Sequence, residues 1–416
     1  MGITIKSVEQ ESWDDRIKRL EGWDPEKIKN SVVLVAGAGA IGNETLKNLS
    51  LLGFGHIIIC DLDIIELTNL TRTVLFSEKD LGLQKAFVAG EKIREMNLEP
   101  TSTVDVFCGD IVYGLGDGVF RMADIVLGCL DNMESRAYIN NLCIRYEKPY
   151  IDAGIGDLSC SLKIMNGHNT GCLSCYNNKI HSQDRFRVSC DISKRKAIDN
   201  NKTPTVQTTS AIVSGLQVQE TLKCLCNINP QYGKEIYIDG RLGKYLSYTL
   251  PVDKNCWSHL GEPYRNAVVK SNLSNKDSLE TVLRWGEKLG YGTLTLEDEK
   301  VMKHFVTEVH CPGCGVIIQV NKPLFSTSHD EWYCENCREK QSYAIQYDNA
   351  IDDITCSSFS LSYTPETLLK KTLEELGIPG FHVIKFINEK NDECMFAELY
   401  ADFESVLPEL FSKKCK

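Results

Sequence analysis

Short apolar runs alternate with amphipathic stretches through the first part of this chain. The runs at 32–36, 57–60, 125–127 and 149–151 carry few polar positions. Apolar runs of this length are typical of parallel strands that are buried on both faces. The stretch 43–52 has apolar residues at helical spacing. This alternation predicts an α/β fold, Rossmann-like in its order, with a mainly parallel sheet and helices on both faces.

The pattern changes after residue 176 and predicts three parts. A polar stretch at 177–205 reads as a long loop, and helical spacing returns at 210–224. The last seventy residues predict a strand (359–363), a helix (365–376) and two more strands (381–387 and 395–400), in which Thr364 and Pro365 start the helix and Gly377 ends it. We therefore expect a first domain at 1–265, linker helices with a cysteine-rich zinc ribbon at 266–345, and a small α+β domain at 346–416.

Composition restricts the class of protein. Of 416 residues, 42% are hydrophobic and 25% are charged, as in globular proteins that are soluble. A net charge of −11 argues against nucleic acid as a main partner. No apolar stretch approaches the roughly 20 residues that span a bilayer, and the first ten residues lack the apolar core of a signal peptide. We expect a cytoplasmic protein without membrane contact, whose 18 cysteines are reduced thiols or metal ligands.

A glycine-rich turn marks the first candidate site. Gly37, Gly39 and Gly42 follow the first apolar run and precede the first helix. Glycines in this context let the backbone approach a phosphate at a helix N-terminus. Asp61 ends the next run, nineteen residues after Gly42, where a carboxylate can accept ribose hydroxyls. Up to this point a nicotinamide-dependent dehydrogenase fits the sequence equally well.

Three later features favour a nucleoside triphosphate. Arg72 and Lys85 follow the ribose carboxylate in order, and fixed cations suit a leaving pyrophosphate. Hydride transfer has no such need. Asp131 and Asn132 follow the run at 125–127, at the sheet edge where open α/β sheets bind ligands. A carboxylate there can hold Mg²⁺ against phosphates.

These motifs together resemble the E1 / ThiF–MoeB superfamily of ATP-dependent carboxylate-activating enzymes. The resemblance covers roughly residues 10 to 260 and includes GAGAIG, the run from Asp61 to Arg72, GLQKA and LDNMESR. It implies that Asp61 binds ribose, that Asn69, Arg72 and Lys85 contact phosphates, and that Asp131 handles Mg²⁺. The nucleotide-binding residues expected on this basis are Gly37, Gly39, Gly42, Asp61, Asp63, Asn69, Arg72, Lys85, Asp131 and Asn132.

The resemblance also implies a homodimer or pseudo-dimer in which an N-terminal arginine reaches the partner's ATP. Arg16 best matches that position. The sequence departs from the family pattern at Trp13, where a second arginine is common.

Cysteine spacing predicts two structural zinc sites. Cys172 and Cys175 form one pair, and the resemblance places the remaining ligands at Cys256 and His259. The alternative is that Cys256 and His259 are unrelated surface residues. A zinc ribbon is predicted from two further pairs separated by nineteen residues, with four ligands that leave no open position: Cys311, Cys314, Cys334 and Cys337.

A reactive thiol would decide the step after adenylation. Cys190 lies in the polar loop among several basic residues, which could favour a thiolate. In E1-like enzymes a crossover loop at this place carries the thioester cysteine, so the resemblance implies that role for Cys190. The alternative is an incidental loop thiol, and Asp191 disfavours ionisation.

The sequence-based interpretation is an E1-like enzyme that activates a ubiquitin-like protein. Its C-terminal module, similar to a ubiquitin-fold (β-grasp) domain, would recruit an E2-like conjugating enzyme; a packing domain without that role is the alternative. Other hypotheses are activation of a sulfur-carrier protein of the ThiF–MoeB kind, adenylation of a peptide, and a nucleotide-binding adaptor without catalysis.

Overall fold

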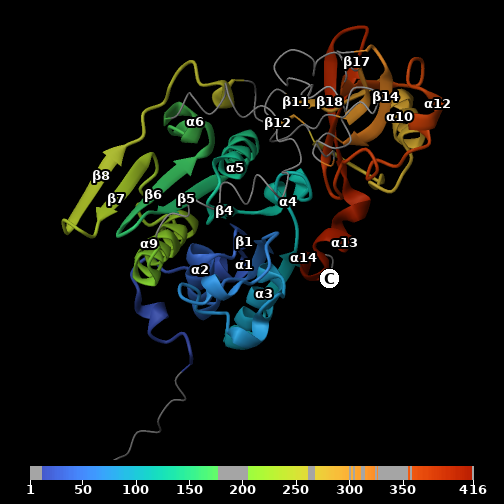
Figure 1. Ribbon diagram of the computed structural model, residues 1–416. Coiled ribbons are helices and arrows are strands. Elements are labelled where there is room, and N and C mark those ends of the chain that lie inside the picture. Colours follow the sequence, from blue (N-terminus) through green and yellow to red (C-terminus); the bar gives the residue numbers. More distant parts are fainter. Residues whose placement is uncertain are drawn as a thin grey trace, which may run out of the picture.

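The first and larger unit is an eight-stranded sheet covered by helices (Figure 1). The computed structural model describes residues 12–176, 205–260, 268–298, 301–302, 305–310, 314–323, 326, 355–356 and 358–414. The strand order is β3-β2-β1-β4-β5-β6-β7-β8. These strands are β1 (Val32–Ala36), β2 (His56–Cys60), β3 (Thr103–Phe107), β4 (Ile125–Gly128), β5 (Pro149–Ile155), β6 (Ser159–Asn166), β7 (Lys234–Asp239) and β8 (Lys244–Thr249).

The first five strands of this order pair in parallel, and the last three are added antiparallel. The α/β fold with a mostly parallel sheet that the sequence predicts is therefore confirmed. The helices of this unit are α1 (Pro25–Asn30), α2 (Ala40–Leu51), α3 (Lys85–Met96), α4 (Asp117–Met122), α5 (Met133–Arg145), α6 (Leu173–Tyr176) and α9 (Gln207–Cys226).

Strand β1 shows how the sheet is buried from both sides. All five of its residues are buried. Val33 and Val35 pack with α1, α2, α3 and α9 in one core, while Val32 and Leu34 pack with α4 and α5 in the other. Alternate side chains of a strand point to opposite faces, so a strand covered on both sides needs an unbroken apolar run. In Figure 1 the helices α2, α3 and α9 lie on one side of this sheet and α5 on the other.

A second sheet lies beside the first unit, with the order β16-β10-β17-β18-β9. Its strands are β9 (Val268–Ser271), β10 (Thr293–Thr295), β16 (Ser358–Ser360), β17 (Val383–Asn388) and β18 (Glu393–Leu399), with helices α10 (Leu279–Lys288) and α12 (Glu366–Leu369). A core that includes Leu283, Leu294 and Phe386 joins α10 to this sheet. Two of the five strands thus come from the segment expected as a linker, 266–345, and three from the expected C-terminal domain.

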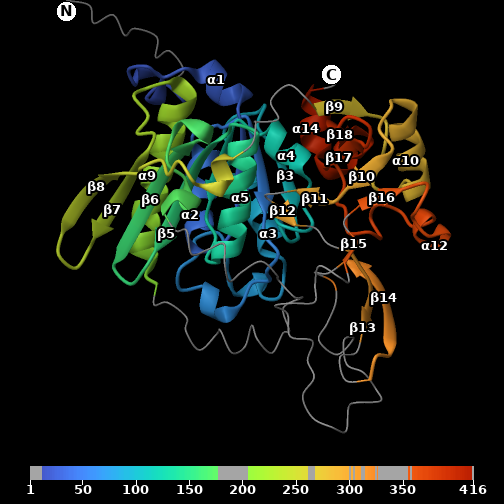
Figure 2. The ribbon, with the colours of Figure 1, turned by 90° about the horizontal axis from the view of Figure 1, so that it is seen from above.

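Two smaller β elements complete the described part of the chain. Strands β11 (Glu297–Asp298) and β12 (Val301–Met302) pair with each other, and β13 (Phe305–His310) lies between β14 (Ile317–Pro323) and β15 (Thr355–Cys356). Figure 2 shows β13 and β14 extending away from both sheets. Of the four ligands expected in the zinc ribbon, Cys314 is exposed beside β14. Cys311, Cys334 and Cys337 lie outside the described residues.

The second sheet packs directly against α4 of the first unit. The backbone N–H of Gly118 donates to the carbonyl of Phe381 at 2.9 Å, and the Phe381 ring belongs to the same core as α4. A Cβ atom at Gly118 would lie 2.5 Å from the Phe381 carbonyl oxygen, so glycine permits this close approach. Arg121 of α4 also forms an ion pair with the buried carboxylate of Glu398.

The last helices return to the edge of the first sheet (Figure 1). They are α13 (Phe403–Val406) and α14 (Pro408–Lys414). The Asp105 carboxylate on β3 accepts the backbone N–H groups of Glu409 and Leu410, both at 3.0 Å. The Lys413 ammonium donates to the Gly55 carbonyl at 2.8 Å. The C-terminal helix therefore satisfies polar groups of β3 and its surroundings. Within the described residues, no helix is long and apolar enough to cross a membrane.

Candidate active site

The glycine turn joins β1 to α2 as the sequence predicts. Gly37 has φ of +98°, a conformation that side chains rarely adopt, and a Cβ atom there would lie 2.6 Å from the Cys129 carbonyl oxygen. A Cβ atom at Gly42 would collide with the Gly37 carbonyl. Gly39, just before α2, has nothing within 4 Å of its Cβ position. Two glycines are therefore required by packing, and the third leaves open space at the helix N-terminus, where an anion is favoured.

Asp61 lies at the carboxyl end of β2, directly beside this turn. Its Oδ2 atom accepts the Ala38 backbone N–H at 2.6 Å, and its Oδ1 atom accepts the Asp63 N–H at 2.8 Å. The residue is 8% exposed. Burial raises the pKa of Asp61 above its ordinary value, although the charge of Lys85 and the two N–H groups oppose that rise. The carboxylate is thus held against the turn that would carry the nucleotide.

Lys85 begins α3 and faces the segment after β2. Its Nζ atom lies 3.0 Å from Oδ2 of Asp63, and its backbone N–H donates to the Asp63 carbonyl at 2.9 Å. The side chain of Lys85 is 11% exposed, whereas that of Asp63 is 54% exposed. Two groups that lie 22 residues apart in the sequence are therefore brought together with Asp61 at one end of the sheet.

Asn69 and Arg72 lie in the loop between β2 and α3. Asn69 is buried at the end of a 3-10 turn (Leu67–Asn69), and its Oδ1 atom accepts the Glu66 N–H at 2.9 Å. Arg72 is half-buried, and its guanidinium makes an exposed hydrogen bond to the Thr68 carbonyl at 2.9 Å. Both side chains help to shape this loop, and the phosphate contacts implied for them remain predictions.

Asp131 and Asn132 follow β4, the neighbour of β1 in the sheet. Asp131 is exposed. Asn132 is the N-cap of α5, because its side chain accepts the Ser135 N–H at 2.8 Å. The Asn132 side chain is therefore engaged in capping, and the exposed Asp131 carboxylate is the group next to it that could bind a cation. Arg16 is exposed just before a short 3-10 turn (Ile17–Arg19), so its contact in trans stays a prediction.

One polar pair near these residues was not anticipated from the sequence. Arg136 of α5 donates to both carboxylate oxygens of Asp152 on β5, with 2.9 Å from Nε to Oδ1, and Asp152 is fully buried. Tyr150 donates its hydroxyl to the same carboxylate at 3.0 Å. Burial disfavours the charge on Arg136, but the charge of Asp152 and the hydrogen bond to it, together with Tyr150 and Asp131, outweigh burial and raise the pKa of the guanidinium. The sequence did show Arg136 four residues after Asn132, at the start of the next helix, but it did not show which carboxylate this arginine pairs with.

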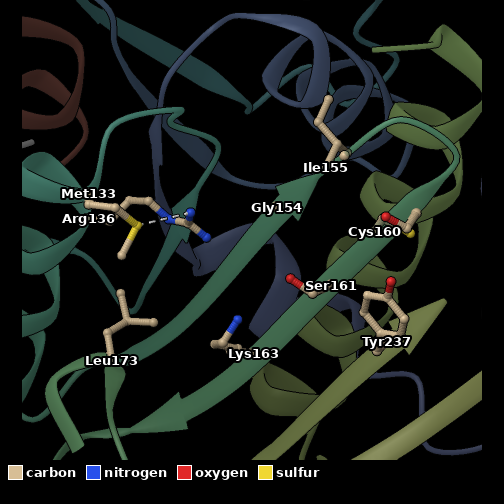
Figure 3. Close-up of a pocket in the computed structure, with 11 residues that line it drawn as sticks. Met133, Arg136, Gly154, Ile155, Cys160, Ser161, Lys163, Leu173 and Tyr237 are labelled. Atoms are coloured by element: carbon tan, nitrogen blue, oxygen red, sulfur yellow. Dashed lines mark hydrogen bonds between the residues drawn. The ribbon is translucent and has the colours of Figure 1, made fainter. Parts of the chain in front are cut away.

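A pocket of about 330 Å³ opens beside this pair, at the carboxyl end of β5 (Figure 3). In Figure 3 the side chains of Arg136, Ser161 and Lys163 point toward the same space. Gly154 and Gly156 also line it. Since β5 pairs with β4, the pocket lies at the same edge of the sheet as the segment that carries Asp131. Its lining is mixed, because large side chains that are mainly apolar also face it: Met133, Ile155, Leu173 and Tyr237.

A second cluster consists of three thiols and one imidazole, and Leu173, between two of its cysteines, lines the pocket. One atom from each of Cys172, Cys175, Cys256 and His259 lies within 4.8 Å of the others. The Cys175 Sγ atom is 3.3 Å from Nδ1 of His259 and also accepts the Asp253 N–H at 3.3 Å. The expected grouping of these four residues is therefore present, and Cys₃His is a donor set that zinc accepts in tetrahedral sites.

Their mutual contacts shift the acidities within the cluster. Hydrogen bonds from the thiols of Cys172 and then Cys256 lower the pKa of Cys175, so this sulfur favours the thiolate form. The hydrogen bond with Cys175 raises the pKa of His259 to about 9. A zinc ion that binds here displaces the remaining protons of the thiols and the imidazole, so the fit of these four side chains to a structural zinc ion rests on their donor atoms and their spacing.

The predicted nucleophile cannot be placed in this arrangement. Cys190 falls in the segment 177–204, which lies outside the described residues. The described chain resumes at residue 205, just before α9. The structure therefore neither brings Cys190 to the glycine turn nor separates it from the turn.

Comparison with known proteins gives a consistent set of relatives. Residues 16–258, more than half of the chain, match the model of the ThiF family. SUMO-activating enzyme subunit 2 of Dictyostelium discoideum is 36% identical over 151 residues, which are 36% of this chain and 22% of that protein. A probable molybdopterin-synthase adenylyltransferase of Porphyra purpurea is 28% identical over 236 residues, 57% of this chain and 56% of that protein.

Among solved structures, the crystal structure of E. coli MccB with ATP matches with a TM-score of 0.46 and 28% identity. The match covers 56% of this chain and 67% of that one. The chain spans less than two thirds of the length of the two sequence relatives named above.

Proposed function

The chain belongs to the ThiF family, and from that premise we propose that it uses ATP to adenylate a carboxylate. In this reaction a carboxylate oxygen attacks the α-phosphorus of ATP and the bond to the β-phosphate breaks. The products are an acyl-adenylate and pyrophosphate. Two contacts at the carboxyl edge of one sheet carry the proposal. Asp61 accepts a hydrogen bond from the glycine turn, and Lys85 forms an ion pair with Asp63. This is the edge at which open α/β folds bind nucleotides.

Each side chain in this junction has a proposed role. Asp61 would accept the ribose hydroxyls, while Asn69, Arg72 and Lys85 would contact the phosphates. Cations held in place before the reaction stabilise the charge that develops on pyrophosphate. Asp131 would hold Mg²⁺, which neutralises phosphate charge when it is bound. Asp131 is exposed, whereas the side chain of Asn132 caps α5, and both observations support Asp131 as the cation ligand.

The substrate proposed is the C-terminal carboxylate of a ubiquitin-like protein, most simply a glycine. Among the relatives, one is named for SUMO activation. The pocket beside Arg136 supports the proposal, because it lies at the same edge of the sheet as the segment that carries Asp131, where the chain end of a substrate could reach the nucleotide. Cys190 would then capture the acyl group as a thioester and release AMP. An E2-like partner, recruited by the C-terminal module, would receive it.

Two further assignments accompany this proposal. Cys172, Cys175, Cys256 and His259 would bind one structural zinc ion, and the zinc ribbon of the later cysteine pairs would bind a second. The chain would act as a homodimer, with Arg16 completing the ATP site of the partner. The exposure of Arg16 is compatible with that contact.

A second candidate is activation of a sulfur-carrier protein. The relative from Porphyra purpurea, named as a molybdopterin-synthase adenylyltransferase, aligns with 57% of this chain and favours this alternative. Adenylation would be the same, but a sulfurtransferase would act next and no E2-like protein would be involved. Adenylation of a peptide is a third possibility, and a catalytically inactive adaptor a fourth.

Two variants test the proposal and separate its steps. Asp131→Ala should lower the rate of ATP–pyrophosphate exchange by about 100-fold or more, because a cation ligand is lost. Normal exchange in that variant would refute the Mg²⁺ assignment. Cys190→Ala should abolish a thiol-sensitive adduct with the carrier and leave exchange intact, with the exposed thiol variant Cys394→Ala as a matched control. An adduct that survives in Cys190→Ala would place the nucleophile elsewhere.

A further inference from the structure

Helix α9 holds the phosphate-side helix α2 through three polar contacts. Gln207 donates to the Glu44 carboxylate at 2.7 Å, and Ser214 donates to the Ile41 carbonyl at 2.9 Å. Gln217 accepts the Thr45 hydroxyl at 2.8 Å. Gln207, Ser214 and Gln217 are separated by seven and by three positions, so they lie on one face of α9. One polar face of α9 therefore runs along the first two turns of the helix that starts at the glycine turn.

Gln217 is the most deeply engaged of these three side chains. It is fully buried. Its Oε1 atom accepts from Thr45 and from the Cys129 thiol, the latter at 3.5 Å. Its Nε2 atom donates to the carbonyls of Gly128 at 3.1 Å and Ile151 at 2.9 Å. A glutamine amide offers two donors and two acceptor positions, so the whole capacity of this side chain is used.

The partners of Gln217 are parts of the candidate nucleotide site. Gly128 ends β4 and Cys129 follows it on the way to Asp131, and the Cys129 carbonyl is the group that limits residue 37 to glycine. Ile151 immediately precedes Asp152, the partner of Arg136. A single buried amide therefore links the helix after the glycine turn, the end of β4 and the middle of β5.

We infer that Gln217 is a positioning residue of the nucleotide site. It fixes the distance between the N-terminal turns of α2 and the end of β4, and hence between the glycine turn and the segment that carries Asp131. Without the amide, the Gly128 and Ile151 carbonyls would be buried without these donors, and a buried carbonyl that loses its donor is costly. The backbone of β4 and β5 would then shift where these carbonyls lie. The inference rests on the proposed function only in that the site is taken to bind ATP with Mg²⁺.

The effect of replacing Gln217 on nucleotide affinity distinguishes a positioning residue from a residue that only stabilises the fold. Loss of the latter would lower stability and leave nucleotide affinity unchanged at temperatures where the protein stays folded. A positioning residue changes nucleotide affinity in the folded protein as well. Outer contacts that orient binding groups typically cost about 10- to 100-fold in affinity or activity when they are removed.

The test compares Gln217→Met with Val213→Ala. Methionine keeps the length of the side chain without its hydrogen bonds, and Val213 is a fully buried residue of the same helix that packs in the apolar core. The measurement is the Kd of full-length protein for MgATP at a temperature well below both melting transitions. We expect Gln217→Met to raise this Kd about tenfold and Val213→Ala to leave it within about twofold. An unchanged Kd in Gln217→Met, or an equal rise in Val213→Ala, would overturn the inference.

Thr45→Val provides an independent variant if Gln217→Met does not fold. Valine keeps the shape of threonine and removes the hydroxyl that donates to Gln217. We expect a raised Kd for MgATP in this variant, and an effect in the double variant that is smaller than the two single effects combined. A Kd within about twofold of the wild type in Thr45→Val would contradict the inference. Because binding is measured without turnover, a wild-type protein that binds MgATP but shows no exchange would refute the proposed function and still allow this test.

Discussion

The Oδ2 atom of Asp61 lies 2.6 Å from the backbone nitrogen of Ala38, so the predicted ribose-binding carboxylate also holds the glycine turn. The turn and the carboxylate come from the ends of adjacent parallel strands, β1 and β2. This contact gives Asp61 two tasks in one site. It supports the turn, and it is the acid proposed to accept the ribose hydroxyls.

Replacement of Asp61 should separate affinity from stability. Asp61→Asn keeps one oxygen that can accept the Ala38 N–H but removes a buried charge, so MgATP should bind about tenfold or more weakly. Asparagine also loses the bond that Oδ1 of Asp61 accepts from the Asp63 N–H, which offsets the relief of the buried charge, so the free energy of unfolding should change by less than about 2 kcal/mol. Nucleotide binding and chemical denaturation measure the two effects. A variant that loses stability without losing affinity would contradict this account of Asp61.

The raised pKa of Asp61 predicts a specific pH dependence. Between the ordinary pKa of an aspartate and the raised value, the folded state binds a proton at this site that the unfolded state has lost. The contribution of Asp61 to stability therefore falls as pH rises through that window. The free energy of unfolding of Asp61→Asn minus that of the wild type should increase over the same window. A difference that is flat with pH, measured by chemical denaturation, would show that burial does not raise this pKa.

The Cys₃His cluster should contain one zinc ion that supports the fold. Cys256→Ser should lower the zinc content by about one ion per chain and lower Tm, because the remaining ligands are buried without their metal. Cys394→Ser is the matched control, since Cys394 is exposed in the second sheet. Elemental analysis and thermal denaturation are the measurements. Equal zinc content in Cys256→Ser and the control would rule out this ligand assignment.

Docking of the second sheet on α4 should depend on glycine. Gly118→Ala places a methyl group 2.5 Å from the Phe381 carbonyl oxygen and should destabilise the protein by about 1–3 kcal/mol. Gly215→Ala is the control, because its Cβ position in the interior of α9 has nothing within 4 Å. That change should be neutral or stabilise the protein by up to about 1 kcal/mol. If the two variants have the same free energy of unfolding, the contact with α4 is not tightly packed.

The nucleotide end of the fold was predictable because its determinants are local. The runs that form β1 and β2 are apolar on both faces, and the glycines follow the first run directly. Asp61 could be placed because strand ends and the carboxyl edge of a parallel sheet coincide. The contact between Asp63 and Lys85 could not be predicted in this way, because it depends on the conformation of the loop between them.

Other features depend on tertiary contacts that spacing does not reveal. The predicted helix at 365–376 is shorter, because α12 ends at Leu369. The following residues hydrogen bond to the segment before α10 instead, and Leu279 N–H donates to the Lys371 carbonyl at 2.8 Å. Tertiary hydrogen bonds therefore outweighed helical propensity in this segment.

Polar side chains in the core were missed for a related reason. Gln217 reads from sequence as one polar position on an amphipathic helix, yet it is fully buried. Its partners at Thr45, Gly128 and Ile151 lie far away in the sequence and meet only when the sheet and α9 assemble. The ion pair between Arg136 on α5 and Asp152 on β5 was not predicted for the same reason.

The most direct test of the proposed adenylation is ATP–pyrophosphate exchange with ubiquitin-like and sulfur-carrier proteins that end in glycine. Each carrier is supplied with a free C-terminal carboxylate or with a C-terminal amide, and full-length protein is assayed with Mg²⁺ and zinc present. We predict exchange that requires a carrier with the free carboxylate and that falls by about 100-fold or more in Asp131→Ala. Absence of exchange with every carrier, or equal exchange with the amidated forms, would contradict the account.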